Sequence, residues 1–281
     1  MKCISCDSEK FLEYSKKSYL NIPVYQCDEC KLIVTGKTKN EVNDAISSIY
    51  SNEFWDEQKE IYGNIDNEFT DIISKSKQRD FISQFKFCKS FFQNRKKILE
   101  IGSGTGHTIF WLDQKGFHVT GIEPDLQNVI SINPKLKNSK IIHCYIDDFT
   151  KDEKYEIIWM SHVFEHLAEP DIFLENIKNK ISEDGVFFLE VPNCDHSPTL
   201  KDSIFGSPHV YHFTSKTIID LCKKHNFEII TCKIFRPANK IEGILNKLFR
   251  NIIKIFPYYP RIECGIKQGR DLRIMLKMIK N

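Results

Sequence analysis

Residues 97–106 read KILEIGSGTG, a short apolar run followed at once by three glycines on alternate positions. The apolar run predicts a buried β-strand. Gly102, Gly104 and Gly106 predict a tight turn whose backbone N–H groups can approach a ligand closely. The next residues, HTIFWLDQKG, predict a helix that ends near Gly116. Together these residues predict a strand–turn–helix unit of the kind that opens a nucleotide-binding site.

A second strand follows, because FHVTGIEP leads to an acidic residue, Glu123, at its tip. An acid at this place accepts hydrogen bonds from ribose hydroxyls. The spelling E-x-G-x-G-x-G differs from the dinucleotide motif G-x-G-x-x-G, whose third glycine lies one residue later. It resembles the first motif of class I S-adenosylmethionine-dependent methyltransferases. The resemblance implies that the cofactor-binding residues are Glu100, Gly102, Gly104, Gly106 and Glu123.

The resemblance extends over more than a hundred residues. YEIIWMSHVFEHLAEP at 155–170 is similar to the fourth strand of the family and its E-H-L loop, and DGVFFLEVPN at 184–193 to the fifth strand. SPHVYHFTSKTIIDLCKKHNFEII at 207–230 is similar to a later H-x-x-[FY]-[ST] block, a helix and the sixth strand. The resemblance implies an α/β fold, a doubly wound, Rossmann-like sheet of seven strands. RDLRIMLKMIK would be its last strand, antiparallel to FEIITCKIF.

The chain departs from the family at the acid that contacts adenine, which usually follows a glycine after the third strand. Here that place reads IIHCYIDDF, so Asp147 and Asp148 are the two candidates. Ser161 and His162, at the end of the fourth strand, complete the cofactor-binding residues that the resemblance implies.

The first forty residues carry a separate pattern, C-x2-C, twenty residues, then C-x2-C. Two such turns can complete a tetrahedral sulfur shell around zinc, and the ligands would be Cys3, Cys6, Cys27 and Cys30. Four thiolates leave no open position, so the ion would be structural. FLEYS and IPVYQ between the turns predict a short hairpin, as in a zinc ribbon.

These patterns predict three parts. Residues 1–38 form a zinc-ribbon-like module, residues 39–95 a helical linker or lid, and residues 96–281 the methyltransferase domain with a helical insertion near 239–256. Tyr50, Trp55 and Tyr62 in the helical part are candidates to line a substrate pocket, although aromatics at helical spacing more often form core.

Methyl transfer needs alignment of the acceptor and, for a hydroxyl acceptor, removal of one proton. Histidine suits that task near neutral pH. The base candidates are His209 and His212, with Glu165 as a partner. His166 in the E-H-L loop is a further catalytic candidate, or it braces the loop.

Charge is divided unevenly along the chain. From residue 233 onward there are 12 Lys or Arg against three Asp or Glu, whereas the preceding 232 residues have an excess of seven acids. The basic part suits an anionic partner such as a nucleotide-sugar, a second subunit or a membrane surface touched by the basic helix at 239–256. A long nucleic acid normally needs a broader basic footprint.

The sequence therefore predicts methyl transfer from S-adenosylmethionine to a small molecule, with O-methylation favoured. The E-H-L loop together with H-x-x-H-F, which is HVYHF at 209–213, resembles the motifs of bacterial sugar and surface-glycan methyltransferases, some of which carry an N-terminal zinc module. This resemblance implies a nucleotide- or glycan-linked sugar of bacterial surface polysaccharide biosynthesis as the acceptor. The alternatives are an RNA methyltransferase that reads RNA with its zinc ribbon and a non-enzymatic cofactor-binding module. No secretory signal or membrane-spanning run is recognisable, so a cytoplasmic location is expected.

Overall fold

A computed structural model describes the chain except residues 51–77, 151, 240, 243–260 and 280–281. Trp55, Tyr62, the side chain of Tyr50 and most of the expected helical insertion at 239–256 therefore lie outside the described residues. In the described part, no helix is both long and apolar enough to cross a bilayer.

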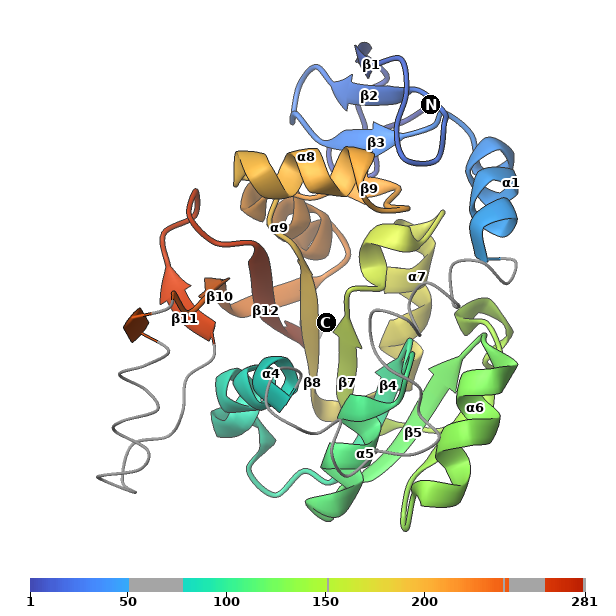
Figure 1. The fold of residues 1–281 in the computed structure, drawn as a ribbon, viewed down its shortest axis with the longest axis vertical. Helices are drawn as coiled ribbons and strands as arrows, with labels where there is room; N and C mark the ends of the chain where they lie inside the picture. The colour runs from blue at the N-terminus through green and yellow to red at the C-terminus, as the bar shows by residue number, and fades with distance from the viewer. Residues whose placement is uncertain (51–77, 151, 240, 243–260, 280–281) are drawn as a thin grey trace.

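A twisted sheet of eight strands forms the centre of the described structure (Figure 1). Its strands, from one edge to the other, are β11 (Arg261–Cys264), β10 (Phe227–Pro237), β12 (Asp271–Met278), β8 (Ile181–Pro192), β7 (Tyr155–Ser161), β4 (Lys97–Ile101), β5 (His118–Glu123) and β6 (Lys140–His143). The strands β8, β7, β4, β5 and β6 are parallel, and β12 is antiparallel to both of its neighbours, β8 and β10. Parallel strands joined by helices give the Rossmann-like α/β fold expected from the sequence.

The expected count of seven strands is wrong by one. The seven predicted strands are present, including the antiparallel pairing of β10 with β12, and β11 adds an eighth at the edge. The long β10 explains the addition, because it extends to Pro237 and its last four residues pair with Arg261–Cys264. The residues of β11, 261–264, lie just beyond the segment at 239–256 that was assigned to the helical insertion.

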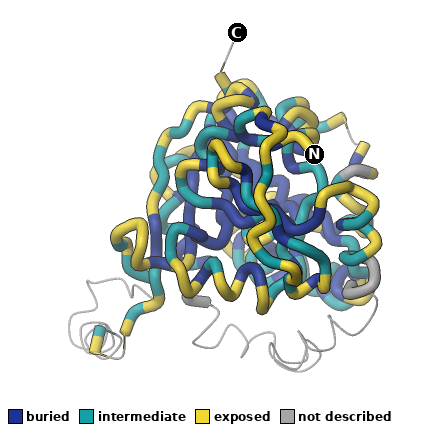
Figure 2. The backbone as a smooth tube through the Cα atoms, turned by 90° about the horizontal axis from the view of Figure 1, so that it is seen from above, coloured by how far each residue is buried: buried dark blue, intermediate teal, exposed yellow. Residues whose placement is uncertain are grey.

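Helices cover both faces of the sheet, and alternate residues of each strand supply the two cores. One face packs against α4 (Gln78–Phe92), α5 (His107–Gln114) and α6 (Leu126–Ile132), with Ile98 and Trp159 in the strands beneath. The other face packs against α7 (Pro170–Ile177) and α9 (Ser215–Lys224) through Leu99 and Met160. This strand alternation places neighbouring apolar residues on opposite faces. Figure 2 shows the buried backbone in the interior and the exposed backbone outside it.

The helix α4 belongs to the core of the sheet. Its Phe85 packs edge-on to Trp111 with ring centroids 4.8 Å apart, and its Phe92 lies 5.6 Å from Phe117. The described part of the expected helical lid therefore includes a helix that seals one face of the sheet, whereas α1 (Lys39–Tyr50) lies beside the N-terminal module (Figure 1).

The N-terminal module forms its own small sheet. β1 (Phe11–Ser15) and β2 (Val24–Cys27) make the hairpin expected from FLEYS and IPVYQ, and β3 (Ile33–Thr35) pairs with β2. The fourth strand of this sheet comes from the main domain, since β9 (Tyr211–His212) pairs with β3. Side chains of Val24 and Ile33 also pack on α8 (Ser197–Phe205) through Ile204. The module is thus joined to the main domain by backbone hydrogen bonds and by a shared core.

Candidate functional site

The glycine loop between β4 and α5 has one closed side and one open side. At Gly102 (φ +71°) an added side-chain carbon would lie 2.3 Å from Val163 Cγ2, so only glycine fits against the loop after β7. At Gly104 (φ +50°) an added carbon would meet no described atom within 4 Å. The open face at Gly104 can therefore receive a ligand, and the closed face places this loop beside the E-H-L loop.

Glu123 lies beneath the glycine loop at the tip of β5 and is 1% exposed. Its Oε2 accepts from the Gly104 N–H at 2.6 Å, and its Oε1 accepts from the Asp125 N–H at 3.0 Å. Burial raises the pKa of Glu123 to about 7 against the opposing effect of these N–H groups. Each carboxylate oxygen can accept a second hydrogen bond, so the residue can hold the loop and still bind a ribose hydroxyl.

Glu100 ends the buried strand that leads into the loop, and it is 3% exposed. Its Oε2 has no hydrogen-bond partner among the described residues. Burial raises the pKa of Glu100 to about 8. A buried carboxylate oxygen without a donor is costly, and a cationic group such as the ammonium of S-adenosylmethionine would satisfy it. The residues at this end of the sheet therefore fit that cofactor.

Ser161, the last residue of β7, lies opposite Glu190 of β8, near the carboxyl ends of both strands. The Glu190 carboxylate accepts from Ser161 Oγ at 2.9 Å, from Gln84 Nε2 at 2.5 Å and from the buried Arg273 guanidinium. Burial alone would raise the pKa of Glu190, but Arg273 and His162 hold it well below its usual range. Glu190 is therefore an ionised carboxylate in a buried network that fixes the end of β7.

His162 follows Ser161 with a left-handed backbone (φ +54°). Its ring lies between two carboxylates, with Nδ1 3.3 Å from Glu165 Oε1 and Nε2 3.4 Å from Glu190 Oε1. Desolvation opposes its protonation, although 43% of the side chain is exposed, and the two carboxylates raise the pKa of His162 well above its ordinary value. The two carboxylates therefore favour the protonated ring of His162.

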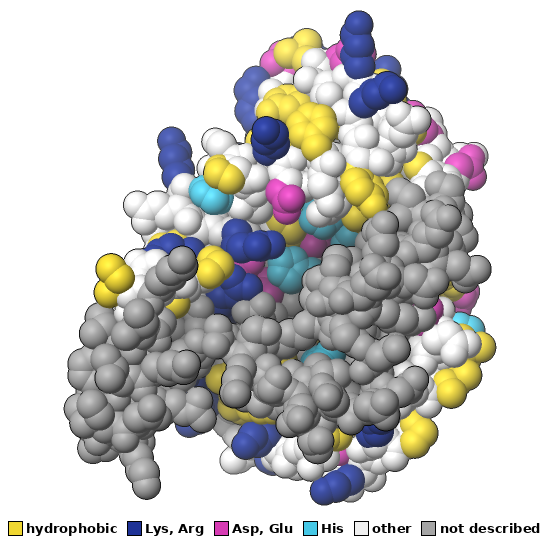
Figure 3. All heavy atoms as spheres, in the orientation of Figure 1, with side chains coloured by type: hydrophobic (Ala, Val, Ile, Leu, Met, Phe, Trp, Pro, Cys, Tyr) yellow, Lys and Arg dark blue, Asp and Glu magenta, His cyan; other side chains and the backbone are white. Residues whose placement is uncertain are grey.

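The E-H-L loop and the H-x-x-H-F block meet beside this network. Glu165 and His166 lie on the short helix η3 (Phe164–His166), and the Val210 N–H donates to the Glu165 carbonyl at 2.9 Å. The rings of His166 and His209 are 4.7 Å apart, and His209 Nε2 lies 3.8 Å from Glu165 Oε1. Figure 3 shows histidine side chains beside acidic ones near the middle of the visible face.

His212 has a different environment from His209. It is 1% exposed, its Nε2 lies 2.9 Å from Thr35 Oγ1, and its Nδ1 lies 2.7 Å from Ser203 Oγ. The same Ser203 hydroxyl lies 2.8 Å from His209 Nδ1. Burial lowers the pKa of both rings, that of His212 to about 3. A hydrogen-bonded chain therefore runs from Thr35 of the N-terminal module to His209.

The two adenine candidates lie on the short helix η2 (Ile146–Asp148). Asp148 is exposed, and the side chain of Asp147 lies outside the described residues. Five residues of the network were not predicted as part of the site, namely Thr35, Gln84, Glu190, Ser203 and Arg273. Of these, Glu190 and Arg273 have a sequence signal, because each is a charge inside an apolar run, FFLEVP and LRIML.

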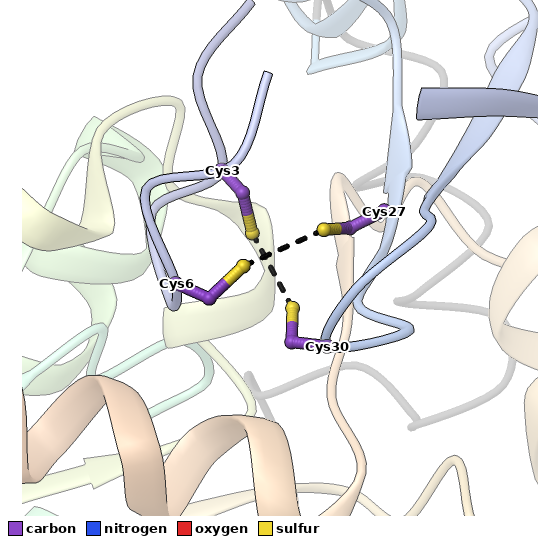
Figure 4. A group of neighbouring side chains, drawn as sticks. All are labelled: Cys3, Cys6, Cys27 and Cys30. Carbon is purple, nitrogen blue, oxygen red and sulfur yellow. Dashed lines mark hydrogen bonds between the residues drawn. The ribbon is translucent and has the colours of Figure 1, made fainter. Parts of the chain in front are cut away.

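The four N-terminal cysteines converge as their spacing predicts (Figure 4). Their sulfur atoms all lie within 4.8 Å of one another, with Cys3 Sγ 3.5 Å from Cys30 Sγ and Cys6 Sγ 3.5 Å from Cys27 Sγ. A tetrahedral ion with bonds of about 2.3 Å needs sulfur atoms about 3.8 Å apart, so the arrangement fits zinc.

A model of the methyltransferase-domain family matches residues 74–232. The chain belongs to this family. Ubiquinone biosynthesis O-methyltransferase of Glaesserella parasuis is 30% identical to this chain over 153 residues. The match covers 51% of this chain and 60% of that protein. An uncharacterized methyltransferase of Alkaliphilus oremlandii is 29% identical over 122 residues, or 41% and 54% of the two chains. The matches thus span little more than half the length of these relatives.

Solved structures show the same fold. A SAM-dependent methyltransferase from Archaeoglobus fulgidus covers 74% of this chain and 97% of its own with a TM-score of 0.56 and 15% identity. A Burkholderia thailandensis 1,6-didemethyltoxoflavin-N1-methyltransferase, solved with bound S-adenosylhomocysteine, covers 91% and 99% with a TM-score of 0.58 and 9% identity. The domain therefore has the class I methyltransferase fold.

Proposed function

We propose that the chain transfers a methyl group from S-adenosylmethionine to an oxygen atom of a small-molecule acceptor. The observation that carries the proposal is the packing of Gly102 on Val163, which sets the cofactor loop directly beside the loop of Glu165 and His166. Family membership and an O-methyltransferase relative support the reaction class.

When bound, S-adenosylmethionine supplies an electrophilic methyl group on a sulfonium, and its leaving thioether needs no acid. The glycine loop, Glu100 and Glu123 would hold and orient it. On the other side, a hydroxyl acceptor must lose a proton as it attacks. Burial lowers the pKa of His209 well below its ordinary value, so its ring is neutral and able to accept that proton.

Of the two base candidates, the geometry favours His209. Its Nε2 faces the Glu165 carboxylate, which would stabilise the imidazolium formed after proton transfer. His212 has both ring nitrogens within hydrogen-bond distance of hydroxyl groups, so it would position His209 through Ser203. His162 lies between the Glu165 and Glu190 carboxylates, which favour its protonated ring, so it is less suited to accept a proton.

For the acceptor we propose a nucleotide- or glycan-linked sugar. The excess of basic residues from position 233 onward supports an anionic group on the acceptor, and the E-H-L and H-x-x-H-F motifs resemble those of sugar methyltransferases. The alternative of an RNA substrate is less well supported, because β3 of the N-terminal module is engaged by β9, and the hairpin region carries Lys10, Lys16 and Lys17 against three acids.

Calorimetry with S-adenosylhomocysteine tests the proposed cofactor. One equivalent should bind, and Glu123→Ala should weaken binding about 10- to 100-fold, since a hydrogen bond to a charged group contributes about 1.5–3 kcal/mol. The exposed Glu228→Ala on β10 is the matched control and should bind normally. Absence of binding by the well-folded wild-type protein would refute the proposed function.

We further propose that the four cysteines hold one structural zinc ion. Metal analysis should find one zinc ion bound to the four cysteines of each chain. Removal of the zinc with a strong chelator should lower the midpoint of thermal unfolding, because zinc binding contributes to folding in small modules. Cys6→Ser should lose the metal, whereas Cys232→Ser, outside the cluster, should retain it. Zinc retention by Cys6→Ser would contradict the assignment.

A further inference from the structure

Glu165, His166 and His209 bring three metal-ligating groups to one point. One carboxylate oxygen and one nitrogen from each ring lie within 4.8 Å of one another. Glu165 is fully buried and the His209 side chain is 12% exposed. The N–H of Val210, next to His209, donates to the carbonyl of Glu165 at 2.9 Å, so backbone contacts hold the two contributing segments together.

The outer hydrogen bonds orient the two rings. His166 Nδ1 lies 3.1 Å from the Pro208 carbonyl, which can only accept, so Nδ1 carries the proton and Nε2 the lone pair of the neutral ring. His209 Nδ1 lies 2.8 Å from Ser203 Oγ, which leaves its Nε2 directed toward Glu165. Metal-ligating histidines usually bind a carbonyl or hydroxyl through their other nitrogen in this way.

A second observation points to a ligand at the same place. Glu165 Oε1 is near His162 Nδ1 and His209 Nε2, whereas Oε2 is buried without a hydrogen-bond partner among the described residues. An unsatisfied buried oxygen in a native structure calls for an explanation, such as a bound ion. A cation beside the two rings that the carboxylate binds through both of its oxygens would satisfy it.

We propose that Glu165, His166 and His209 bind one divalent transition-metal ion beside the glycine loop. Two imidazoles and one carboxylate favour ions such as Mn²⁺, Fe²⁺ or Zn²⁺ over Mg²⁺ or Ca²⁺, which prefer oxygen ligands. Three protein ligands leave positions open for the acceptor.

This inference rests on the proposed function and changes the role of His209 from base to ligand. An acceptor hydroxyl bound to the ion has a lowered pKa and releases its proton to solvent. Its oxygen then forms a bond to the methyl carbon while the sulfur–carbon bond breaks, and the bonding electrons remain on sulfur. The acceptor class is thereby narrowed to molecules whose hydroxyl can chelate, with a neighbouring oxygen as the second ligand.

Mn²⁺ titration of the zinc-loaded full chain, followed by the electron paramagnetic resonance of free Mn²⁺, tests the site without turnover. We expect one bound Mn²⁺ per chain beyond the zinc, and at least about tenfold weaker binding in Glu165→Gln and His209→Ala, the loss that even outer-shell changes cause. His118→Ala is the control, because His118 is exposed at the start of β5. If His209→Ala does not fold, the shape-conserving Glu165→Gln decides.

Failure of this inference is distinguishable from failure of the proposed function. A wild-type chain that binds S-adenosylhomocysteine but takes up no Mn²⁺, and no second zinc, would overturn the metal site and leave His209 as base. Mn²⁺ binding that is equal in wild type, Glu165→Gln and His209→Ala would also overturn it. Mn²⁺ binding without uptake of S-adenosylhomocysteine would support the site and refute the proposed function.

Discussion

Replacing His209 with alanine is expected to lower kcat by about 10²- to 10⁴-fold, the usual contribution of a proton-transfer group. The affinity for S-adenosylhomocysteine should be unchanged, because the proposed cofactor contacts come from the glycine loop and Glu123. Calorimetry and steady-state kinetics with a hydroxyl acceptor measure the two quantities separately. If His209 is a metal ligand, the loss of kcat would be similar, but a high concentration of Mn²⁺ would restore activity to His209→Ala, which retains the other two ligands. Loss of a base would not respond to Mn²⁺.

The matched comparison is His212→Ala, three residues along the same segment. We expect a smaller loss of kcat together with lower thermal stability, because His212 is buried and both of its ring nitrogens face hydroxyl groups of Thr35 and Ser203. Wild-type turnover in both variants would exclude this segment from the chemistry. If kcat falls equally in both variants and their thermal stability is equal, the two histidines together, and not His209 alone, would be required for proton transfer.

Replacing Arg273 with methionine is expected to lower the free energy of unfolding by about 3–5 kcal/mol. The substitution leaves the Glu190 carboxylate charged, buried and without its guanidinium partner, and it removes the donor to Ser83 Oγ at 2.7 Å. Urea denaturation at pH 7 measures the change. The pair holds the pKa of Glu190 down, so its contribution is full above about pH 4.5 and is lost as the pH falls further.

Lys277→Met on the same strand is the control for Arg273. Lys277 is 36% exposed and lies 3.6 Å from Asp184 in a surface ion pair, which is worth about 0–1 kcal/mol. A loss below about 1 kcal/mol in Arg273→Met would show that the buried network tolerates removal of the guanidinium, and Arg273 would then not be the group that stabilises Glu190.

The elements with strong local patterns could be predicted from the sequence. KILEI, FHVTGIE and YEIIWMS are strands at the expected places, because continuous apolar runs between turn residues are typical of buried parallel strands. The final antiparallel pair was also predicted correctly. The eighth strand was not, since RIEC is a short edge segment without alternation and its pairing depends on how far β10 extends.

The site could be predicted as a set of residue types but not as a network. The spacing of the two histidine blocks indicates that they meet at the carboxyl ends of the strands, yet the roles of His209 and His212 depend on Ser203 and Thr35, which have no sequence signal. The pairing of Thr35 with a residue 177 positions away is set by tertiary structure. Local propensity contains no information on such contacts.

The hydrogen bonding of β3 to β9 constrains how the sequence of this chain can evolve. Val34 pairs with Tyr211 and Ile33 with His212, so the N-terminal module holds the strand that follows His209 in place. Exchanging or deleting the first forty residues would leave β9 as an exposed sheet edge. We therefore expect the two segments to be inherited together, with matched variation at these paired positions in any relative that retains the module, and uncorrelated variation there would argue against this dependence.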